Sequence, residues 1–97
     1  MNTNNLNNKL LKVERFINIY RNNDNESIEE INIDHVSLNF LNEIVCQKND
    51  DPLLYDGYVL SEIQLQAINK FLENKITPNF VLYFYVLECA GIYDWGK

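Results

Sequence analysis

Residues 79–91, which read NFVLYFYVLECAG, decide the fold of this chain. The segment from Phe80 to Leu87 is an unbroken apolar and aromatic run of 8 residues, whereas a membrane-spanning helix needs about 20. It is rich in Val, Tyr and Phe and contains no Gly or Pro before Gly91, a composition typical of a β-strand. We therefore predict a central strand that ends at Gly91.

The two faces of this strand are both apolar, because successive side chains of a strand alternate between faces. One face carries Phe80, Leu82, Phe84 and Val86, and the other carries Val81, Tyr83, Tyr85 and Leu87. We expect helices of this chain to cover one face. We expect the helices to leave the opposite face partly open, and we assign Tyr83, Tyr85 and residues of the first hairpin to that face. Its cover is either another part of this chain or a partner.

A hairpin is predicted near the start of the chain. Residues 10–20 alternate between an apolar face and a more solvent-exposed face, as a strand does. Residues 28–33 are predicted to form a second strand with Ile31 and Ile33 inward. The polar cluster at residues 21–27 lies between them and is rich in Asn and Asp, which turns favour. The two strands should pair in antiparallel fashion.

A first helix is predicted from His35 to Gln47, where apolar residues recur at helical spacing. Asp34 is a suitable N-cap, and Pro52 with the polar residues before it ends the helix.

A second helix follows a brief strand at residues 58–60. Ser61 and Gln64 have the spacing of a capping box, in which each residue's side chain bonds to the other's backbone. Apolar residues then recur at helical spacing, and we expect the helix to end near Asn74 or Lys75.

These elements predict an α+β fold with the order β-β-α-β-α-β. The expected architecture is an antiparallel or mixed β-sheet of about four strands with two helices packed on one face. Residues 1–97 are expected to form a single domain, with residues 1–8, five of them Asn, as a frayed terminus.

The N-terminus and the cysteines indicate a cytoplasmic protein. Residues 1–9 lack the apolar segment of a signal peptide. Cys46 and Cys89 are expected to be buried reduced thiols rather than a disulfide.

The formal net charge is -6 at neutral pH, with an isoelectric point near 4.6. Such a surface repels nucleic acid phosphates, so we expect no direct binding of DNA or RNA. It attracts a basic protein and speeds their encounter. A modest negative charge also keeps a protein soluble, and charge alone leaves both explanations open.

No nucleophile and base are predicted to meet. His35 is the single histidine, and Cys46 shares its face of the predicted helix at about 16 Å along the axis, which is too far for contact. Whether Cys89 approaches His35 stays open. Structural roles are expected for all three side chains.

Metal and cofactor motifs are missing as well. Residues 49–51 are acidic but lack the ligand spacing of a calcium loop, and Gly57, Gly91 and Gly96 are too scattered for a phosphate loop. Glu29 and Glu30 should point to opposite faces of their strand. We expect no catalytic residues, no metal, no cofactor and no enzyme activity.

Surface recognition is therefore the expected role. Tyr and Trp favour interface centres, and carboxylates accept hydrogen bonds from Lys and Arg. The candidate partner-binding residues combine the two chemistries: Asp50, Asp51, Tyr55, Asp56, Tyr58, Glu88, Tyr93, Asp94 and Trp95. For Tyr55, Tyr93 and Trp95, a place in the core is an equally open alternative.

Two segments carry a family resemblance. Residues 60–65, LSEIQL, open the second helix, and residues 85–89, YVLEC, end the last strand. Together they resemble small bacterial immunity proteins encoded beside polymorphic or contact-dependent growth inhibition toxins. The resemblance covers the C-terminal part of the chain. It implies a protein that binds a cognate toxin domain, often a basic nuclease, and covers its active site.

The leading hypothesis is thus an immunity protein that neutralises a basic toxin, such as an RNase, without contact to nucleic acid or membrane. One alternative is a small ligand-binding domain with an apolar pocket between sheet and helices. Another is a structural subunit that forms a homodimer through its long first strand. The toxin's identity and the oligomeric state stay open.

Overall fold

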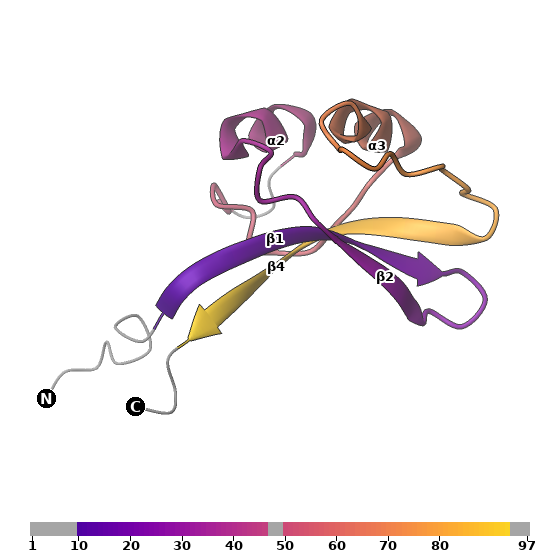
Figure 1. Ribbon diagram of the computed structural model, residues 1–97, viewed down its shortest axis with the longest axis horizontal. Coiled ribbons are helices and arrows are strands. Elements are labelled where there is room, and N and C mark those ends of the chain that lie inside the picture. Colours follow the sequence, from indigo (N-terminus) through magenta and orange to yellow (C-terminus); the bar gives the residue numbers. More distant parts are fainter. Residues whose placement is uncertain (1–9, 47–49, 94–97) are drawn as a thin grey trace, which may run out of the picture.

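The computed structural model describes residues 10–46 and 50–93. Its elements in chain order are β1 (Leu10–Arg21), β2 (Ser27–Asn32), α2 (Leu38–Ile44), β3 (Tyr58–Val59), α3 (Glu62–Asn69) and β4 (Tyr83–Tyr93). The strands form one sheet in the order β2-β1-β4-β3, and every neighbouring pair is antiparallel. The predicted α+β fold and element order are confirmed (Figure 1).

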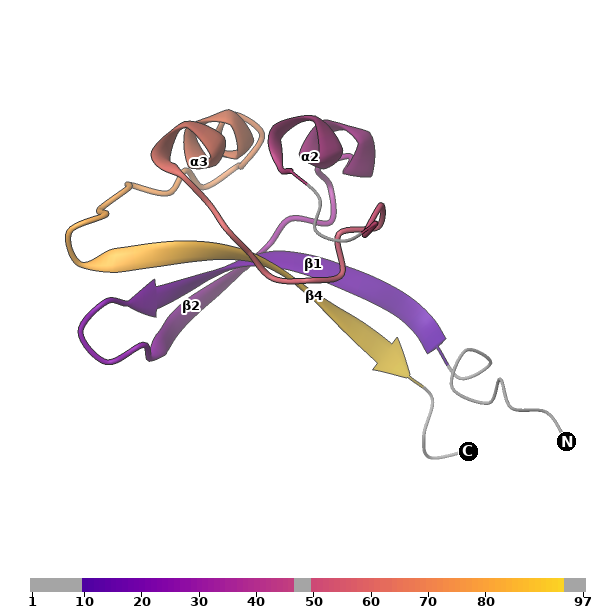
Figure 2. The same cartoon turned by 180° about the vertical axis from the view of Figure 1, so that it is seen from behind.

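Both helices cover the same face of the sheet. Figures 1 and 2 show the molecule from opposite sides, and in each view α2 and α3 lie next to each other above β1 and β4. The described residues place no helix on the other face. We call this second surface the open face.

The core lies between the sheet and the helices. Within the sheet, Ile17 of β1 pairs with Leu87 of β4, and Ile19 pairs with Tyr85. The helices contribute the fully buried side chains Leu41, Leu65 and Ile68. Ile33 and Leu54 of the connecting segments are fully buried as well.

β4 begins and ends later than predicted. It starts at Tyr83 and continues past Gly91. Val81 lies before the strand and is 86% exposed. The reason is a turn at Asn79, whose side-chain oxygen accepts hydrogen bonds from the backbone N–H of Val81 and Leu82, each at 3.1 Å.

The expectation that the tyrosine face of β4 is partly open is wrong, whereas the alternative that this chain covers it is confirmed. Tyr85 and Leu87 point towards the helices and are 1% and 0% exposed, so the tyrosine face is the covered one. Tyr83 packs against the same core. The open face instead receives Phe84 and Val86, which alternate with them. The hairpin residues expected on the open face do lie there.

The first helix is shorter than predicted at both ends. Its N-cap is Ser37, whose hydroxyl accepts a hydrogen bond from the backbone N–H of Phe40 at 3.0 Å. Asp34, the predicted cap, instead accepts a hydrogen bond from the backbone N–H of Arg15 at 2.7 Å. Asp34 therefore fastens the end of the hairpin rather than the start of α2, and His35 precedes the helix.

The predicted capping box of the second helix is confirmed. The Ser61 hydroxyl accepts from the Gln64 N–H at 3.2 Å, and the Gln64 side chain accepts from the Ser61 N–H at 2.9 Å. The helix ends at Asn69, earlier than predicted, because the Asn69 side chain exchanges two hydrogen bonds of 2.8 Å with the backbone of Ile76. These bonds hold the following segment in an irregular conformation.

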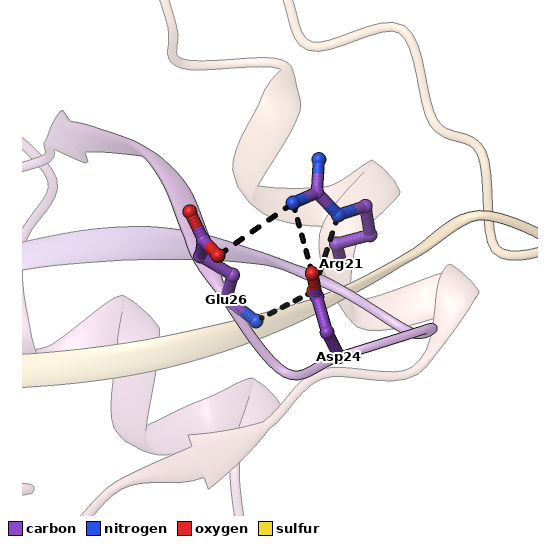
Figure 3. Close-up of polar contacts among 3 residues, drawn as sticks. All are labelled: Arg21, Asp24 and Glu26. Carbon is purple, nitrogen blue, oxygen red and sulfur yellow. Dashed lines mark hydrogen bonds and ion pairs between the residues drawn. The ribbon is translucent and has the colours of Figure 1, made fainter.

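The predicted turn between the first two strands is confirmed and is organised by Asp24 (Figure 3). Arg21 donates to both carboxylate oxygens of Asp24, at 3.1 and 3.0 Å, and the Glu26 N–H donates to the same carboxylate at 3.1 Å. The Arg21 hydrogen bonds lower the pKa of Asp24. Asn25 takes the left-handed conformation, with φ of 59°, which Asn tolerates well.

Among residues 10–46 and 50–93, no helix has the length and apolar character that crossing a bilayer requires.

Candidate functional site

The open face combines carboxylates with aromatic and aliphatic side chains. The strand register assigns a side chain to this face at alternate positions of all four strands. They are Phe16, Asn18 and Tyr20 of β1, Glu30 of β2, Val59 of β3, and Phe84, Val86 and Glu88 of β4.

Asn18 is the centre of a polar cluster on the open face. It is 4% exposed, although no helix of the described residues lies on this face. Its amide nitrogen donates to Glu88 at 3.0 Å and contacts Glu30 and the Tyr20 hydroxyl at 3.4 and 3.2 Å. Its amide oxygen accepts from the Ser27 hydroxyl at 2.6 Å. This buried amide therefore links three strands and the hairpin end.

Tyr20 holds the second oxygen of Glu88. Its hydroxyl donates to that oxygen at 2.7 Å, and its ring stacks on Phe84 with 5.1 Å between centroids and 14° between planes. The hydrogen bond to Glu88 raises the pKa of Tyr20 most, followed by burial and by the charges of Glu88 and Glu30. The hydroxyl therefore stays protonated at neutral pH and keeps the Glu88 carboxylate in place.

The cluster concentrates negative charge. Glu30 and Glu88 lie on opposite sides of Asn18, on β2 and β4. Within the described part of the chain, neither carboxylate takes part in an ion pair. The arrangement is suited to receive a cation from outside, since charge-assisted hydrogen bonds to carboxylates are the strong ones.

A second acidic region is the loop before β3. Asp51 accepts hydrogen bonds from the backbone N–H groups of Tyr55 and Asp56, each at 2.9 Å, and from the Tyr58 hydroxyl at 2.7 Å. The bond from Asp56 lowers the pKa of Asp51 most, with smaller contributions from Tyr55, Tyr58 and the charge of Arg15. The Asp51 carboxylate thus makes hydrogen bonds within the chain that hold this loop in its conformation.

The predicted partner-binding residues fall into separate groups. Asp50, Tyr55 and Asp56 are exposed on the loop that Asp51 organises. Tyr58 is 4% exposed and belongs to the core. Glu88 lies on the open face.

The remaining candidates are at the C-terminus. Tyr93 is the last residue of β4, and only its backbone is described. Asp94 and Trp95 lie outside the described residues.

The sequence-based list missed most of the open-face cluster. Asn18, Tyr20, Ser27 and Glu30 are absent from it, although the alternation of the first strand places Asn18 and Tyr20 on its wetter face. The sequence pattern of a single strand does not show the register in which β1 pairs with β4. That register is what brings Asn18 and Tyr20 next to Glu88.

The thiols and the histidine form no shared site. His35 makes a hydrogen bond of 2.9 Å to the backbone carbonyl of Phe71. Cys46 is exposed, which corrects the expectation that both thiols are buried, whereas Cys89 is partly buried and burial raises its pKa. Both cysteines are free. The described residues contain no group of His, Cys, Asp and Glu suited to hold a metal ion.

A hollow of about 500 Å³ lies on the helix side of the sheet, between β2 and residues 74–77. Ile19, Ile31 and Ile76 supply apolar lining, and Glu29 and Lys75 supply charge. Its volume is in the range of small-molecule sites.

The fold and the open face define a small α+β domain whose sheet surface opposite the helices is acidic and aromatic. Residues 14–88 match DUF7683, a domain of unknown function, and since this match covers most of the chain, the protein belongs to that family. No curated protein and no solved structure matches the chain significantly.

Proposed function

We propose that this chain is a protein-binding domain without catalytic activity that captures a basic protein on its open face. In its specific form, the proposal is an immunity protein that binds a cognate basic toxin domain, such as an RNase, and covers its active site. The cluster in which Asn18 and Tyr20 hold Glu30 and Glu88 is the observation that carries it.

The cluster supports binding because its carboxylates are ordered before a partner arrives. A side chain that is already held loses less conformational entropy on binding than a free one. Glu88 has hydrogen bonds to both oxygens, and each oxygen retains a lone pair for a Lys or Arg of the partner. The Tyr20 and Phe84 rings beside it can pack against the apolar stem of such a side chain or bind its cation.

A nuclease is a fitting target for this chemistry. Nuclease surfaces that hold the phosphate backbone are rich in Lys and Arg, and an acidic domain competes for the same side chains. The exposed Asp50, Tyr55 and Asp56 of the loop offer a second contact region of the same character.

The proposal is tested by co-expressing the tagged chain with the protein encoded immediately upstream. We expect a basic protein to co-purify in equimolar amount, to be toxic alone and to be harmless together with this chain. An empty eluate from cells that are indifferent to the upstream gene would contradict the immunity proposal.

Matched variants identify the contact surface. Glu88→Gln removes a charge from the open face, and Asp56→Asn removes one from the loop. We expect Glu88→Gln to weaken capture by about tenfold, the scale of a lost charged hydrogen bond, and Asp56→Asn to have a smaller effect. The reverse order would move the interface to the loop.

The hollow beside β2 favours a second candidate, a small-ligand-binding domain. This function predicts a small molecule that remains bound through gentle purification. Native mass spectrometry that finds only the mass of the chain would remove it.

A further inference from the structure

We infer that the outer edge of β2 is a docking site for an extended basic segment of the partner, which adds to the sheet as a further strand. The inference rests on the proposed function for the basic character of the partner. It concerns a different surface, because the open face is a side-chain surface whereas the edge of β2 offers backbone groups.

The outer edge of β2 presents backbone N–H and C=O groups that can pair with another strand. Within the described residues, β2 is the outermost strand of the sheet and pairs with β1 alone. The Ile33 N–H donates to the Arg15 carbonyl at 2.8 Å, and backbone groups of an antiparallel strand alternate in direction. The backbone groups of Ile31 and Glu29 therefore point to β1, and those of Glu30 and Asn32 point outward.

β2 carries some of the devices that protect an exposed edge and lacks others. Proteins commonly guard such edges with charged side chains, above all Lys, with Pro, with a covering loop or with a bulge. Glu29 and Glu30 of β2 repel an acidic strand but attract a basic one. The sequence of β2, SIEEIN, has neither Lys nor Pro, and the irregularity in its pairing lies at the turn end, between Ile19 and Tyr20. Ile28 is 42% exposed on it. Among residues 10–46 and 50–93, no other element pairs with this edge.

The hollow next to β2 offers a place for a side chain of the added strand. The apolar surface of Ile19, Ile31 and Ile76 suits the stem of a Lys or Arg, and Glu29 lines the same hollow. Lys75 also lines it, but its ammonium donates to the Leu72 carbonyl at 2.6 Å and is thereby directed to the segment that follows α3.

The charge of β2 decides the kind of occupant. Glu29 and Glu30 place one carboxylate on each face of the sheet. Basic residues at alternate positions of an added strand all lie on one face, and whichever face that is, they meet a carboxylate there. A second copy of this chain would bring β2 against β2 and set like charges together, which is destabilising.

Amide hydrogen exchange with a synthetic peptide of alternating Lys and Val tests the geometry. We expect slower exchange, by about tenfold or more, at the outward Glu30 and Asn32 amides. The Ile31 and Glu29 amides, already bonded to β1, should change little. Peptide N-methylated at every residue, which has no backbone N–H to donate along either edge, should not bind. No binding of the unmethylated peptide, or equal effects on all four amides, would overturn strand addition.

Two substitutions at one position distinguish the contribution of the backbone N–H to binding from that of the carboxylate charge. Glu30→Gln and Glu30→Pro both remove the carboxylate, but only Pro removes the outward N–H, and Pro is tolerated on edge strands. We expect Glu30→Pro to bind the peptide and the co-purified basic protein at least about tenfold more weakly than Glu30→Gln, with circular dichroism unchanged. If Glu30→Pro alters the circular dichroism, Asn32→Pro against Asn32→Ala repeats the comparison at the other outward position.

The outcomes distinguish this inference from the proposed function. If a basic protein binds and the two Glu30 variants bind it equally, the edge is not used and the proposed function stands. If no basic protein binds, the proposed function fails, and the peptide experiment still decides whether the edge accepts a strand. A homodimer in light scattering that Glu30→Pro dissociates would assign the edge to a second copy and overturn the basic occupant.

Discussion

Asn18 connects the strands of the open face through a single side chain. Its amide nitrogen has two hydrogens and lies within 3.0 to 3.4 Å of three oxygens, from Tyr20, Glu30 and Glu88. The amide is buried, so its hydrogen bonds replace those that water would make. The cost of keeping a polar group there is consistent with a surface that is ordered for recognition.

Tyr20→Phe should loosen Glu88 and leave the fold intact. The substitution removes one hydrogen bond to a carboxylate that is partly open to solvent, so we expect a loss of about 1 kcal/mol in the free energy of unfolding. Chemical denaturation measures it. Tyr55→Phe, at a tyrosine that is 50% exposed, is the control and should change stability little. Equal losses for both variants would show that the bond to Glu88 contributes nothing.

Asp51 should make stability depend on pH in acid. Its pKa is lower in the folded protein than in the unfolded chain, so its contribution is present above about pH 4, the unfolded value. That contribution is lost as the pH falls through the folded pKa. Asp51→Asn should therefore be less stable than the parent at pH 7, and the difference in denaturation midpoint should shrink towards pH 3. Asp56→Asn is the matched control, and a difference that is independent of pH would contradict this role for Asp51.

At the scale of elements, side-chain caps determine where the helices begin. Ser37 and Ser61 each accept a hydrogen bond from an N–H of the first helical turn. Asn69 and Asn79 act in a similar way after α3 and before β4, where their side chains bond to nearby backbone groups. Short polar side chains thus interrupt segments whose apolar residues would allow longer elements.

Ser61→Ala should remove the N-cap of α3. We expect a loss of about 1 kcal/mol in the free energy of unfolding, because the Gln64 N–H loses its acceptor. Ser61→Asp keeps an acceptor at the cap and should retain most of the stability. Chemical denaturation of the three proteins gives the comparison, and equal losses for Ala and Asp would rule out the cap as the cause.

At the scale of the whole molecule, the asymmetry of the sheet separates two roles. The helices bury one face, and that face supplies the core. The other face and the edge of β2 are left for contact with a partner, on a chain with net charge -6. Stability and the proposed recognition therefore reside on different sides of the same strands.

Charge should act mainly on the rate at which the basic partner associates. Between about 10 and 150 mM salt, the Debye length falls from about 30 to 8 Å, so steering weakens. We expect the association rate constant to fall by about tenfold or more and the dissociation rate constant to change less, as measured by stopped-flow fluorescence. Glu88→Gln should show a smaller salt dependence. An association rate that is constant across this range would exclude electrostatic steering.

Local patterns in the sequence determined the class of fold. Alternation predicted β1, the spacing of Ser61 and Gln64 predicted the start of α3, and the run at Phe80 to Leu87 identified the central strand. These features depend on neighbours a few residues apart, so one chain segment contains all the information they need.

Only the tertiary structure decided which face of β4 is buried and which residues share a site. Both faces of β4 are apolar, so its own sequence does not distinguish them, and packing against α2 and α3 selects the face with Tyr85. Asn18 meets Glu88 across 70 residues of sequence because β1 pairs with β4 in one register. A shift of one residue would turn each of these side chains to the opposite face. The register is set by the burial of the whole sheet, and no single strand encodes it.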